Sequence, residues 1–283
     1  KKQQPKIKAK YLPLKPESFI RPDNCAEDCN ETLKLISQGR FAIAVAAGMS
    51  RKYGLETPKL LIKPDWGGED TLIEYLIHRI RSIGKQAIDR FGKNYEKKRE
   101  PIIIYIMVNS AEIENVQSYL NSVRNFNYPG IVTFGQDVLP YINERGEMVF
   151  KDMNKDRLKL VSNGSGALLS ALSSQGVLEH LLSSGVQVLQ YVNLNNLMVP
   201  LAEPRMVQEC KKGADIVVQM SHRDLDQAEI FPTILQDPET GTFEYLNVRE
   251  TTSYLAHRDT PRLDFECKAL NVYVSIDLFR RAV

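Results

Sequence analysis

Short, continuous apolar runs alternate along this chain with longer segments in which apolar residues recur every three or four positions. The apolar runs are FAIAVAAG at residues 41–48, PIIIYIMV at 101–108, GIVTFGQ at 130–136 and VQVLQYVNL at 186–194. A short apolar run of this kind is typical of a strand that is buried on both faces of a sheet. We therefore expect four buried strands at these positions.

The segments between the runs have helical spacing. Residues 25–39 place apolar side chains on one face and stop at Gly39, and residues 70–92 open with Asp-Thr, a common helix start. Helices are also predicted over residues 111–124, 167–184 and 204–212. Strands that alternate with helices favour an α/β fold, in which helices flank both faces of a mostly parallel sheet.

The remaining segments extend this picture at both ends. Residues 1–24 contain four prolines and predict an extended lead-in before one large domain at 25–283. Further strands are predicted at residues 214–220, 242–248 and 270–278. Strand and turn signals crowd residues 221–265, where antiparallel strands could make the sheet mixed.

Composition excludes several classes of function. The 283 residues are 43% hydrophobic, enough for a full-sized core, and 37 basic against 35 acidic side chains leave a net charge of +2. This balance gives no reason to expect nucleic acid as a partner. Because no apolar run reaches the roughly 18–20 residues of a membrane span, we expect no membrane contact and an intracellular, cytoplasmic protein, with an organelle as the alternative.

Cysteine and histidine do not form a recognisable metal or catalytic pattern. The first two of the four cysteines are four residues apart, but no second pair completes a zinc site. We therefore expect free thiols in a reducing compartment, and we expect the four scattered histidines to be structural or on the surface.

Candidate chemistry gathers in the turns that follow the buried strands, because ligands of such sheets bind outside the carboxyl ends of the strands. The turn after the first strand, AAGMSRKYGLETPK at residues 46–59, combines small residues with three cations. Gly48 and Ser50 let the backbone approach a phosphate, while Lys52 and Lys59 neutralise charge, with Lys59 stiffened at the rim by Pro58. Alone, such a turn either reverses the chain or holds an anion.

Six motifs give the chain a family resemblance. The order A-A-G-x-S-x-K-x-G followed by P-K resembles the signature loop of sugar-nucleotide nucleotidyltransferases. Later elements resemble, in the same order, those of the eukaryotic-type UDP-sugar pyrophosphorylases (the UDP-glucose and UDP-N-acetylglucosamine branches): YIMVNSAE (105–112), FGQDVLPYINERGEM (134–148), VSNGSG (161–166), YVNLNNL (191–197) and ALNVYVSIDLFRR (269–281). The chain is identified as a divergent member of this family.

The resemblance implies a fold and a set of phosphate contacts. The fold is that of nucleotide-diphospho-sugar transferases, GT-A-like and Rossmann-like, which we expect over residues 25–283 with the C-terminal part of the family domain missing. Ala47 and Gly48 would offer backbone groups to the uracil or ribose, and Ser50 would hold phosphate oxygens. Lys52 and Lys59 match the catalytic cations, which would meet the phosphates of UTP.

The resemblance also implies base and sugar contacts. Gln136 and Gly164 occupy positions that read the edge of uracil, since an amide and a backbone group together supply donors and acceptors. Ser165 stands where an asparagine usually contacts the nucleoside or sugar. Asn247 and Glu250 lie in the segment that carries sugar ligands.

Asn195 leaves two hypotheses open. It stands where the family has a metal-binding aspartate, and an amide is a poorer ligand for Mg²⁺ than a carboxylate. In the first hypothesis the protein is a uridylyltransferase that uses Mg²⁺ and forms a UDP-sugar and pyrophosphate from UTP and a sugar-1-phosphate. In the second it is a catalytically inactive relative that serves as a structural or nucleotide-binding subunit of a larger assembly with protein partners.

Overall fold

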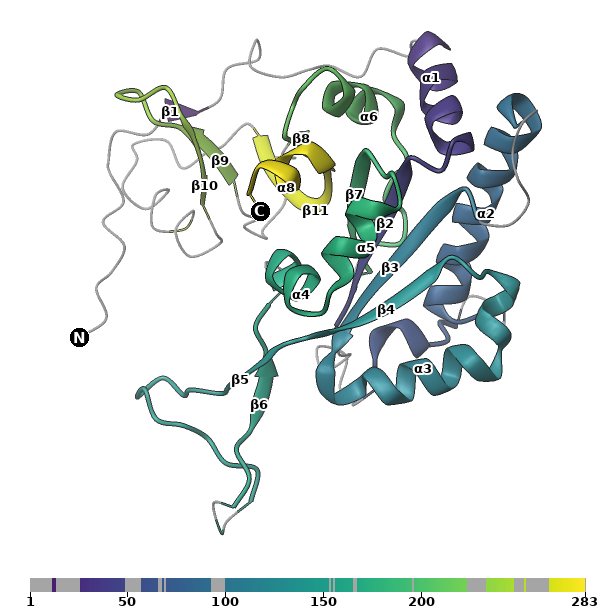
Figure 1. Cartoon of the computed structure of the whole chain (residues 1–283). Helices are drawn as coiled ribbons and strands as arrows, with labels where there is room; N and C mark the ends of the chain where they lie inside the picture. The colour runs from purple at the N-terminus through teal and green to yellow at the C-terminus, as the bar shows by residue number, and fades with distance from the viewer. Residues whose placement is uncertain are drawn as a thin grey trace.

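A six-stranded sheet forms the centre of the protein, as shown by a computed structural model of the whole chain (Figure 1). The structure describes residues 12–13, 26–48, 57–65, 68, 70–92, 100–152, 154, 156–164, 167–194, 196–222, 233–246, 252 and 265–282. The strand order is β4 (Ile131–Gln136), β3 (Ile102–Asn109), β2 (Phe41–Ala47), β7 (Val188–Asn193), β11 (Phe265–Ser275) and β8 (Ile216–His222).

The sheet is mixed but mostly parallel. Strands β4, β3, β2 and β7 run parallel to one another, and β11 runs antiparallel to both of its neighbours, β7 and β8. These four parallel strands are the four apolar runs of the sequence, so the expected mixed α/β fold is confirmed.

Strand β2 is apolar throughout because both of its faces are buried. Phe41, Ile43 and Val45 belong to one core cluster, while the alternating Ala42 and Ala44 belong to another, because successive side chains point to opposite faces of a sheet. The first cluster includes residues of α1 (Ala26–Ser37), α2 (Leu72–Phe91), α3 (Ile113–Ser122) and α6 (Pro204–Lys211); the second includes residues of α4 (Leu168–Ser174), α5 (Val177–Ser183) and α8 (Ile276–Ala282). Helices therefore cover both faces of the sheet (Figure 1).

Two predicted elements differ from the structure. The helix expected at residues 167–184 is interrupted, since Gly176 takes a left-handed conformation (φ 69°) that separates α4 from α5. The strand expected at residues 270–278 ends at Ser275, where α8 begins. Ile276 and Phe279 are both buried, and a spacing of three residues places two side chains on one face of a helix.

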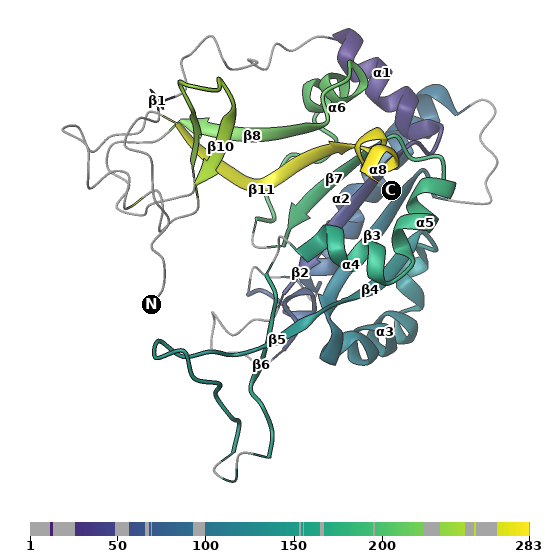
Figure 2. The same ribbon diagram turned by 60° about the vertical axis from the view of Figure 1, so that its left-hand side comes forward.

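Smaller elements surround the central sheet. Strands β1 (Leu12–Pro13), β9 (Thr233–Gln236) and β10 (Phe243–Leu246) form an antiparallel sheet in the order β1-β9-β10, and β9 and β10 confirm the antiparallel strands expected within residues 221–265. Strands β5 (Val138–Pro140) and β6 (Leu160–Ser162) form the stem of an arm that projects from the body (Figures 1 and 2). The sequence did not predict this arm, which comprises residues 137–162. Three 3₁₀ helices complete the described elements: η3 (Lys59–Leu61), η4 (Ser110–Glu112) and η5 (Arg124–Asn127).

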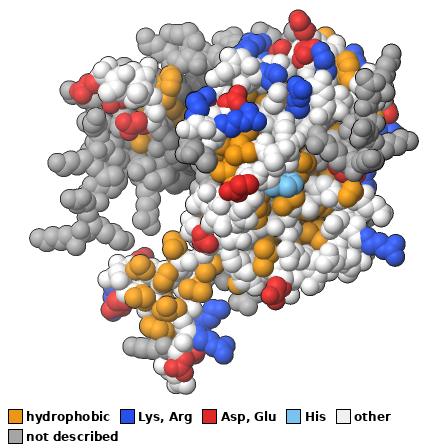
Figure 3. Space-filling model, in the orientation of Figure 1, with side chains coloured by type: hydrophobic (Ala, Val, Ile, Leu, Met, Phe, Trp, Pro, Cys, Tyr) orange, Lys and Arg blue, Asp and Glu red, His pale blue; other side chains and the backbone are white. Residues whose placement is uncertain are grey.

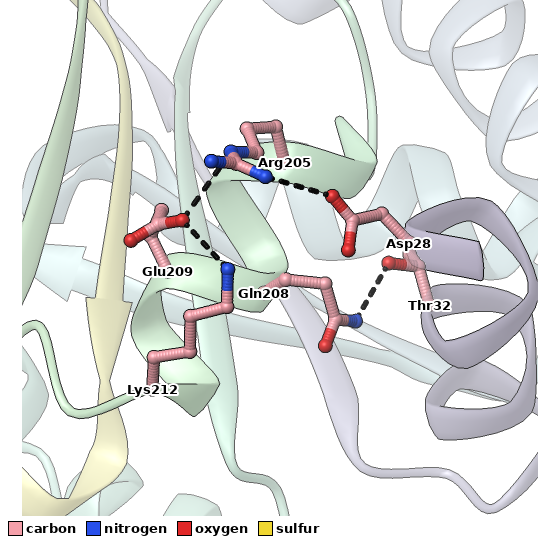
Figure 4. Close-up of polar contacts among 6 residues, drawn as sticks. All are labelled: Asp28, Thr32, Arg205, Gln208, Glu209 and Lys212. Carbon is pink, nitrogen blue, oxygen red and sulfur yellow. Dashed lines mark hydrogen bonds and ion pairs between the residues drawn. The ribbon is translucent and has the colours of Figure 1, made fainter. Parts of the chain in front are cut away.

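Polar contacts fasten α1 to α6 on one face of the sheet (Figure 4). Arg205 forms ion pairs with Asp28 of α1 and with Glu209 of its own helix, each at 3.3 Å. Gln208 Nε2 donates to the Oγ1 of the buried Thr32 at 3.1 Å. Near this contact, Cys29 and Cys210 are both free thiols, and burial raises the pKa of Cys210 to about 12. Among the described helices none is long and apolar enough to cross a membrane.

Candidate functional site

The register of the parallel strands brings four strand ends to one edge of the sheet. Ala47 pairs with Val108, Asn109 pairs with Gln136, and Ala46 pairs with Asn193. The carboxyl ends of β2, β3, β4 and β7 therefore lie in one row. This row is where the sequence predicted a ligand site.

The turn after β2 is packed closely against residues further along the chain. Ala47 is buried, and the carbonyl of Gly48 accepts a hydrogen bond from the backbone N–H of Lys59 at 2.9 Å. Among the described residues, no atom outside Gly48 and its chain neighbours lies within 4 Å of a Cβ built on Gly48, so these residues leave room beside the backbone. Lys59 is only 6% exposed and lies deeper than the rim position that we expected. Ser50 and Lys52 lie outside the described residues.

The structure joins the two residues predicted to read the base. Gln136 is 4% exposed at the end of β4, and its Nε2 donates to the carbonyl oxygen of Gly164. Gly164 has φ 92°, a left-handed value that favours glycine, so the turn depends on this residue type. None of the described residues donates to Gln136 Oε1. Ser165, the next predicted contact, is not among the described residues.

Two residues at the end of β3 hold this pair in place. Asn109 is buried; its Oδ1 accepts from the backbone N–H of Ala111 at 2.9 Å, and its Nδ2 donates to Ser162 Oγ at 3.0 Å. Ser110 Oγ donates to the carbonyl of Gln136 at 2.6 Å. We call Asn109, Ser110, Gln136, Ser162 and Gly164 the strand-end platform.

Our sequence analysis assigned no role to Asn109, Ser110 or Ser162. The signal was available in part, because Asn109 and Ser110 are polar residues that close an otherwise apolar strand. Such residues tend to serve a site or a cap. The contact with Ser162, which is 53 positions away, could not be read from that pattern.

The segment after β7 is fixed by two buried or half-buried side chains. Gln190 is fully buried, donates to the carbonyl of Pro200 at 2.8 Å and accepts from the N–H of Ala202 at 2.9 Å. Arg79 of α2 donates to the carbonyls of Leu197 and Val199. These contacts hold residues 197–202 against the sheet, shortly after position 195 in the chain.

The residue predicted to bind a metal lies outside the described residues, as do the two predicted sugar ligands. Asn195, Asn247 and Glu250 all lie outside the described residues. Within the described part, one group of three potential ligands, Asp70, Glu74 and His78 at the start of α2, has ligand atoms within 4.8 Å of one another. Its imidazole makes this group unlike an all-oxygen Mg²⁺ site.

Comparison with known proteins identifies the family. The family model described as UTP–glucose-1-phosphate uridylyltransferase matches residues 1–251. The chain belongs to this family.

Curated proteins with low sequence identity to the chain are named as UDP-sugar pyrophosphorylases or as similar to them. UDP-N-acetylhexosamine pyrophosphorylase-like protein 1 of Homo sapiens is 23% identical over 264 residues, which is 90% of this chain and 51% of the relative. UDP-N-acetylglucosamine diphosphorylase 2 of Arabidopsis thaliana is 21% identical over 263 residues, or 86% of this chain and 52% of the relative. The chain thus spans about half the length of these relatives.

Solved structures of similar proteins share the fold. The uridine diphosphate N-acetylglucosamine pyrophosphorylase of Trypanosoma brucei matches with a TM-score of 0.80 at 18% identity, over 96% of this chain and 56% of that one. A UDP-glucose phosphorylase of the same organism matches with a TM-score of 0.66 at 13% identity, over 96% and 55%. The nucleotidyltransferase fold expected from the six motifs is therefore confirmed.

Proposed function

We propose that the protein is a UTP-dependent uridylyltransferase that forms a UDP-sugar and pyrophosphate from a sugar-1-phosphate. The observation that supports this most is the strand-end platform, which joins Gln136 and Gly164 at the same sheet edge as the Gly48 turn. Relatives named for N-acetylhexosamine or N-acetylglucosamine substrates favour an N-acetylated sugar as the acceptor.

The platform favours uracil over cytosine. One of the two N–H groups of Gln136 Nε2 holds the Gly164 carbonyl, which leaves Oε1 and the second N–H for a base. Oε1 only accepts hydrogen bonds, and uracil offers an N–H donor at N3 where cytosine has an acceptor. In this proposal Oε1 faces N3 of the base, where it would pair with uracil and repel cytosine.

The reaction asks mainly for positioning. An oxygen of the sugar-1-phosphate attacks the α-phosphorus of UTP, the bond to the bridging oxygen breaks, and pyrophosphate leaves with the electron pair. The protein would hold the base on the platform and the phosphates beside the Gly48 turn, where Lys52 and Lys59 would balance their charge. Ala47 and Ser50 would add backbone and hydroxyl contacts.

Magnesium is proposed as a cofactor that arrives with UTP. Asn193 and Asn196, the described polar side chains nearest in sequence to position 195, are amides, which fit Mg²⁺ poorly. The phosphate oxygens of UTP are better ligands for a hard dication, and the ion would supply charge neutralisation there.

Pyrophosphate release tests the proposal. The chain would be incubated with UTP, Mg²⁺ and a panel of N-acetylglucosamine-, N-acetylgalactosamine- and glucose-1-phosphate, while calorimetry measures binding of UTP and CTP. We expect UTP binding with weaker CTP binding, and turnover with an N-acetylated sugar. Equal binding of both nucleotides would contradict the role of Gln136, and absence of UTP binding would overturn the whole proposal.

A second candidate is nucleotide binding without turnover, in a subunit of a larger assembly. Asn195 favours it, because the family position for a metal-binding carboxylate holds an amide. The Asn195→Asp variant separates the two candidates. Binding without turnover in both forms would favour the inactive subunit, whereas turnover in the wild type would favour the enzyme.

A further inference from the structure

The arm at residues 137–162 is built around a three-way junction of the backbone. Tyr141 N–H donates to the carbonyl of Lys159 at 2.7 Å, and Lys159 N–H donates to the carbonyl of Val149 at 2.8 Å. Val149 N–H closes the ring by donating to the carbonyl of Tyr141 at 2.9 Å. Three short pairs of antiparallel segments therefore meet at one ring of three hydrogen bonds.

The positions that flank this ring are all apolar. They form three cross-strand pairs, which we call the junction cluster: Pro140 with Leu160, Ile142 with Met148, and Phe150 with Leu158. Residues directly opposite in a pair share a face, and so do residues two positions apart in a strand. All six side chains therefore belong to one face of the arm.

This face is open to solvent. Ile142 and Met148 are each 58% exposed and Leu160 is 39% exposed. Five of the eight large hydrophobic side chains that are exposed in the described part of the chain lie on the arm. Figure 3 shows hydrophobic side chains gathered there. A contiguous exposed apolar face of this kind marks an interaction site.

The arm also has little stabilisation of its own. Its stem consists of two strands of three residues each, and the other two pairs are single bridges. Strand pairs this short are marginal in water unless a further apolar surface covers them. A partner that covers the junction cluster would therefore stabilise the arm as well as bind it.

The charges around the cluster fit a second copy of the same chain. Residues 143–147 (NERGE) carry two acidic residues and one basic residue, a net charge of −1. Residues 151–157 (KDMNKDR) carry three basic and two acidic residues, a net charge of +1. We call residues 143–147 the acidic tip and residues 151–157 the basic tip. In a two-fold contact between identical patches, the acidic tip of one copy can lie against the basic tip of the other, so that opposite charges meet.

We propose that two copies of this chain associate through the junction clusters of their arms. The apolar faces pack against each other, and the opposite charges of residues 143–147 and 151–157 favour one alignment of the two arms. This association is independent of whether the proposed reaction occurs, because the cluster includes none of the predicted nucleotide contacts.

Sedimentation velocity over a range of concentrations tests the proposal on the full chain. The wild type should show a reversible monomer–dimer equilibrium. Ile142→Lys should raise the dimer dissociation constant about tenfold or more, because it places a charge in the contact. Leu139→Lys is the matched control: Leu139 is 52% exposed on the opposite face of the same arm, so this variant should dimerise like the wild type.

Three results would overturn the proposal. These are a wild type that stays monomeric at every concentration, a dimer that Ile142→Lys does not weaken, and equal weakening by Leu139→Lys. Met148→Lys repeats the test at the partner position of the same pair, and thermal unfolding of each variant shows that the arm change has not unfolded the domain. The first of these results includes the case in which the chain stays monomeric and a different partner covers the junction cluster.

Discussion

The strand-end platform and the junction cluster are neighbours in the chain but opposite in character. The platform is polar, with Asn109 and Gln136 buried, and its side chains hydrogen-bond to one another or to the backbone. The cluster is apolar and exposed at Ile142, Met148 and Leu160. The arm lies between Gln136 and Gly164 in the chain, so the hydrogen-bonded pair proposed to bind the base stands where the arm leaves the body, and the apolar face lies further out.

This difference shows how one stretch of chain can carry a site and a separate surface side by side. Buried hydrogen bonds specify geometry because a lost partner leaves an unsatisfied group. Exposed apolar side chains specify no geometry until something covers them. We therefore expect substitutions at the platform to change stability and nucleotide binding together, and substitutions at the cluster to change association alone.

The largest effect is expected from Gln136→Glu. A carboxylate in this buried position would face the Gly164 carbonyl and lose the donor that holds it. The free energy of unfolding should fall by about 2–3 kcal/mol, and UTP affinity should fall about tenfold or more, which corresponds to about 1.4 kcal/mol of binding. Denaturant unfolding and calorimetry measure the two quantities.

Gln117→Glu is the matched control for this change. Gln117 donates to Thr133 Oγ1 at 3.1 Å on the exposed side of α3. Its substitution should change stability by less than about 0.5 kcal/mol and leave UTP affinity unchanged. If Gln117→Glu lowered stability and UTP affinity as much as Gln136→Glu does, the buried position of Gln136 would not explain its effect.

Asn109→Ala should have the next largest effect. It removes the acceptor for Ala111 N–H and the donor to Ser162, which costs about 1–3 kcal/mol of folding free energy in a buried position. UTP affinity should fall less than for Gln136→Glu, because Gln136 still holds Gly164. The exposed Asn115, which donates to Glu112, supplies the control variant Asn115→Ala. An Asn109 variant with wild-type stability would contradict the platform.

Local patterns predicted the core of this fold because the core strands are buried on both faces. Phe41–Ala47 and Ile102–Asn109 are apolar at nearly every position for that reason, and runs this short are more typical of strands than of helices. The arm was missed for the opposite reason. Its three pairs depend on contacts between residues 141, 149 and 159, and the chain reverses twice between them without a strand long enough to show an alternating pattern.

The site was predicted only as a set of separate turns. The positions of Gln136 and Gly164 came from family motifs, and their direct contact required the register of β3 with β4 and the return of the arm. Asn109 contacts Ser162 and Gln190 contacts Asn271, which are 53 and 81 positions away, so the local pattern could show only that a polar residue stands in or after an apolar run. Their roles became visible only in three dimensions.

A smaller effect is expected where polar contacts are partly open to water. Asp28→Asn weakens the ion pair with Arg205, in which the two side chains are 16% and 29% exposed. The loss should be about 0.5–1 kcal/mol, as for a pair near the surface. Asp277→Asn, in the exposed pair with Arg280, should change stability by even less. If Asp28→Asn lowered the free energy of unfolding as much as Asn109→Ala does, burial would not be what separates strong from weak polar contacts in this protein.

The smallest effect is expected from Ile142→Lys on UTP affinity. Three stem pairs and the hydrogen bond from Asn163 N–H to the carbonyl of Asp137, at 3.2 Å, lie between Ile142 and the platform. Substitutions at such separated sites are nearly additive, so UTP affinity should stay within about twofold of the wild type while association weakens. Calorimetry should be run below the concentration at which the wild type dimerises, so that both proteins are compared as monomers. A change of about tenfold would instead show that the stem transmits strain from the cluster to Gly164, and that arm and platform act as one unit.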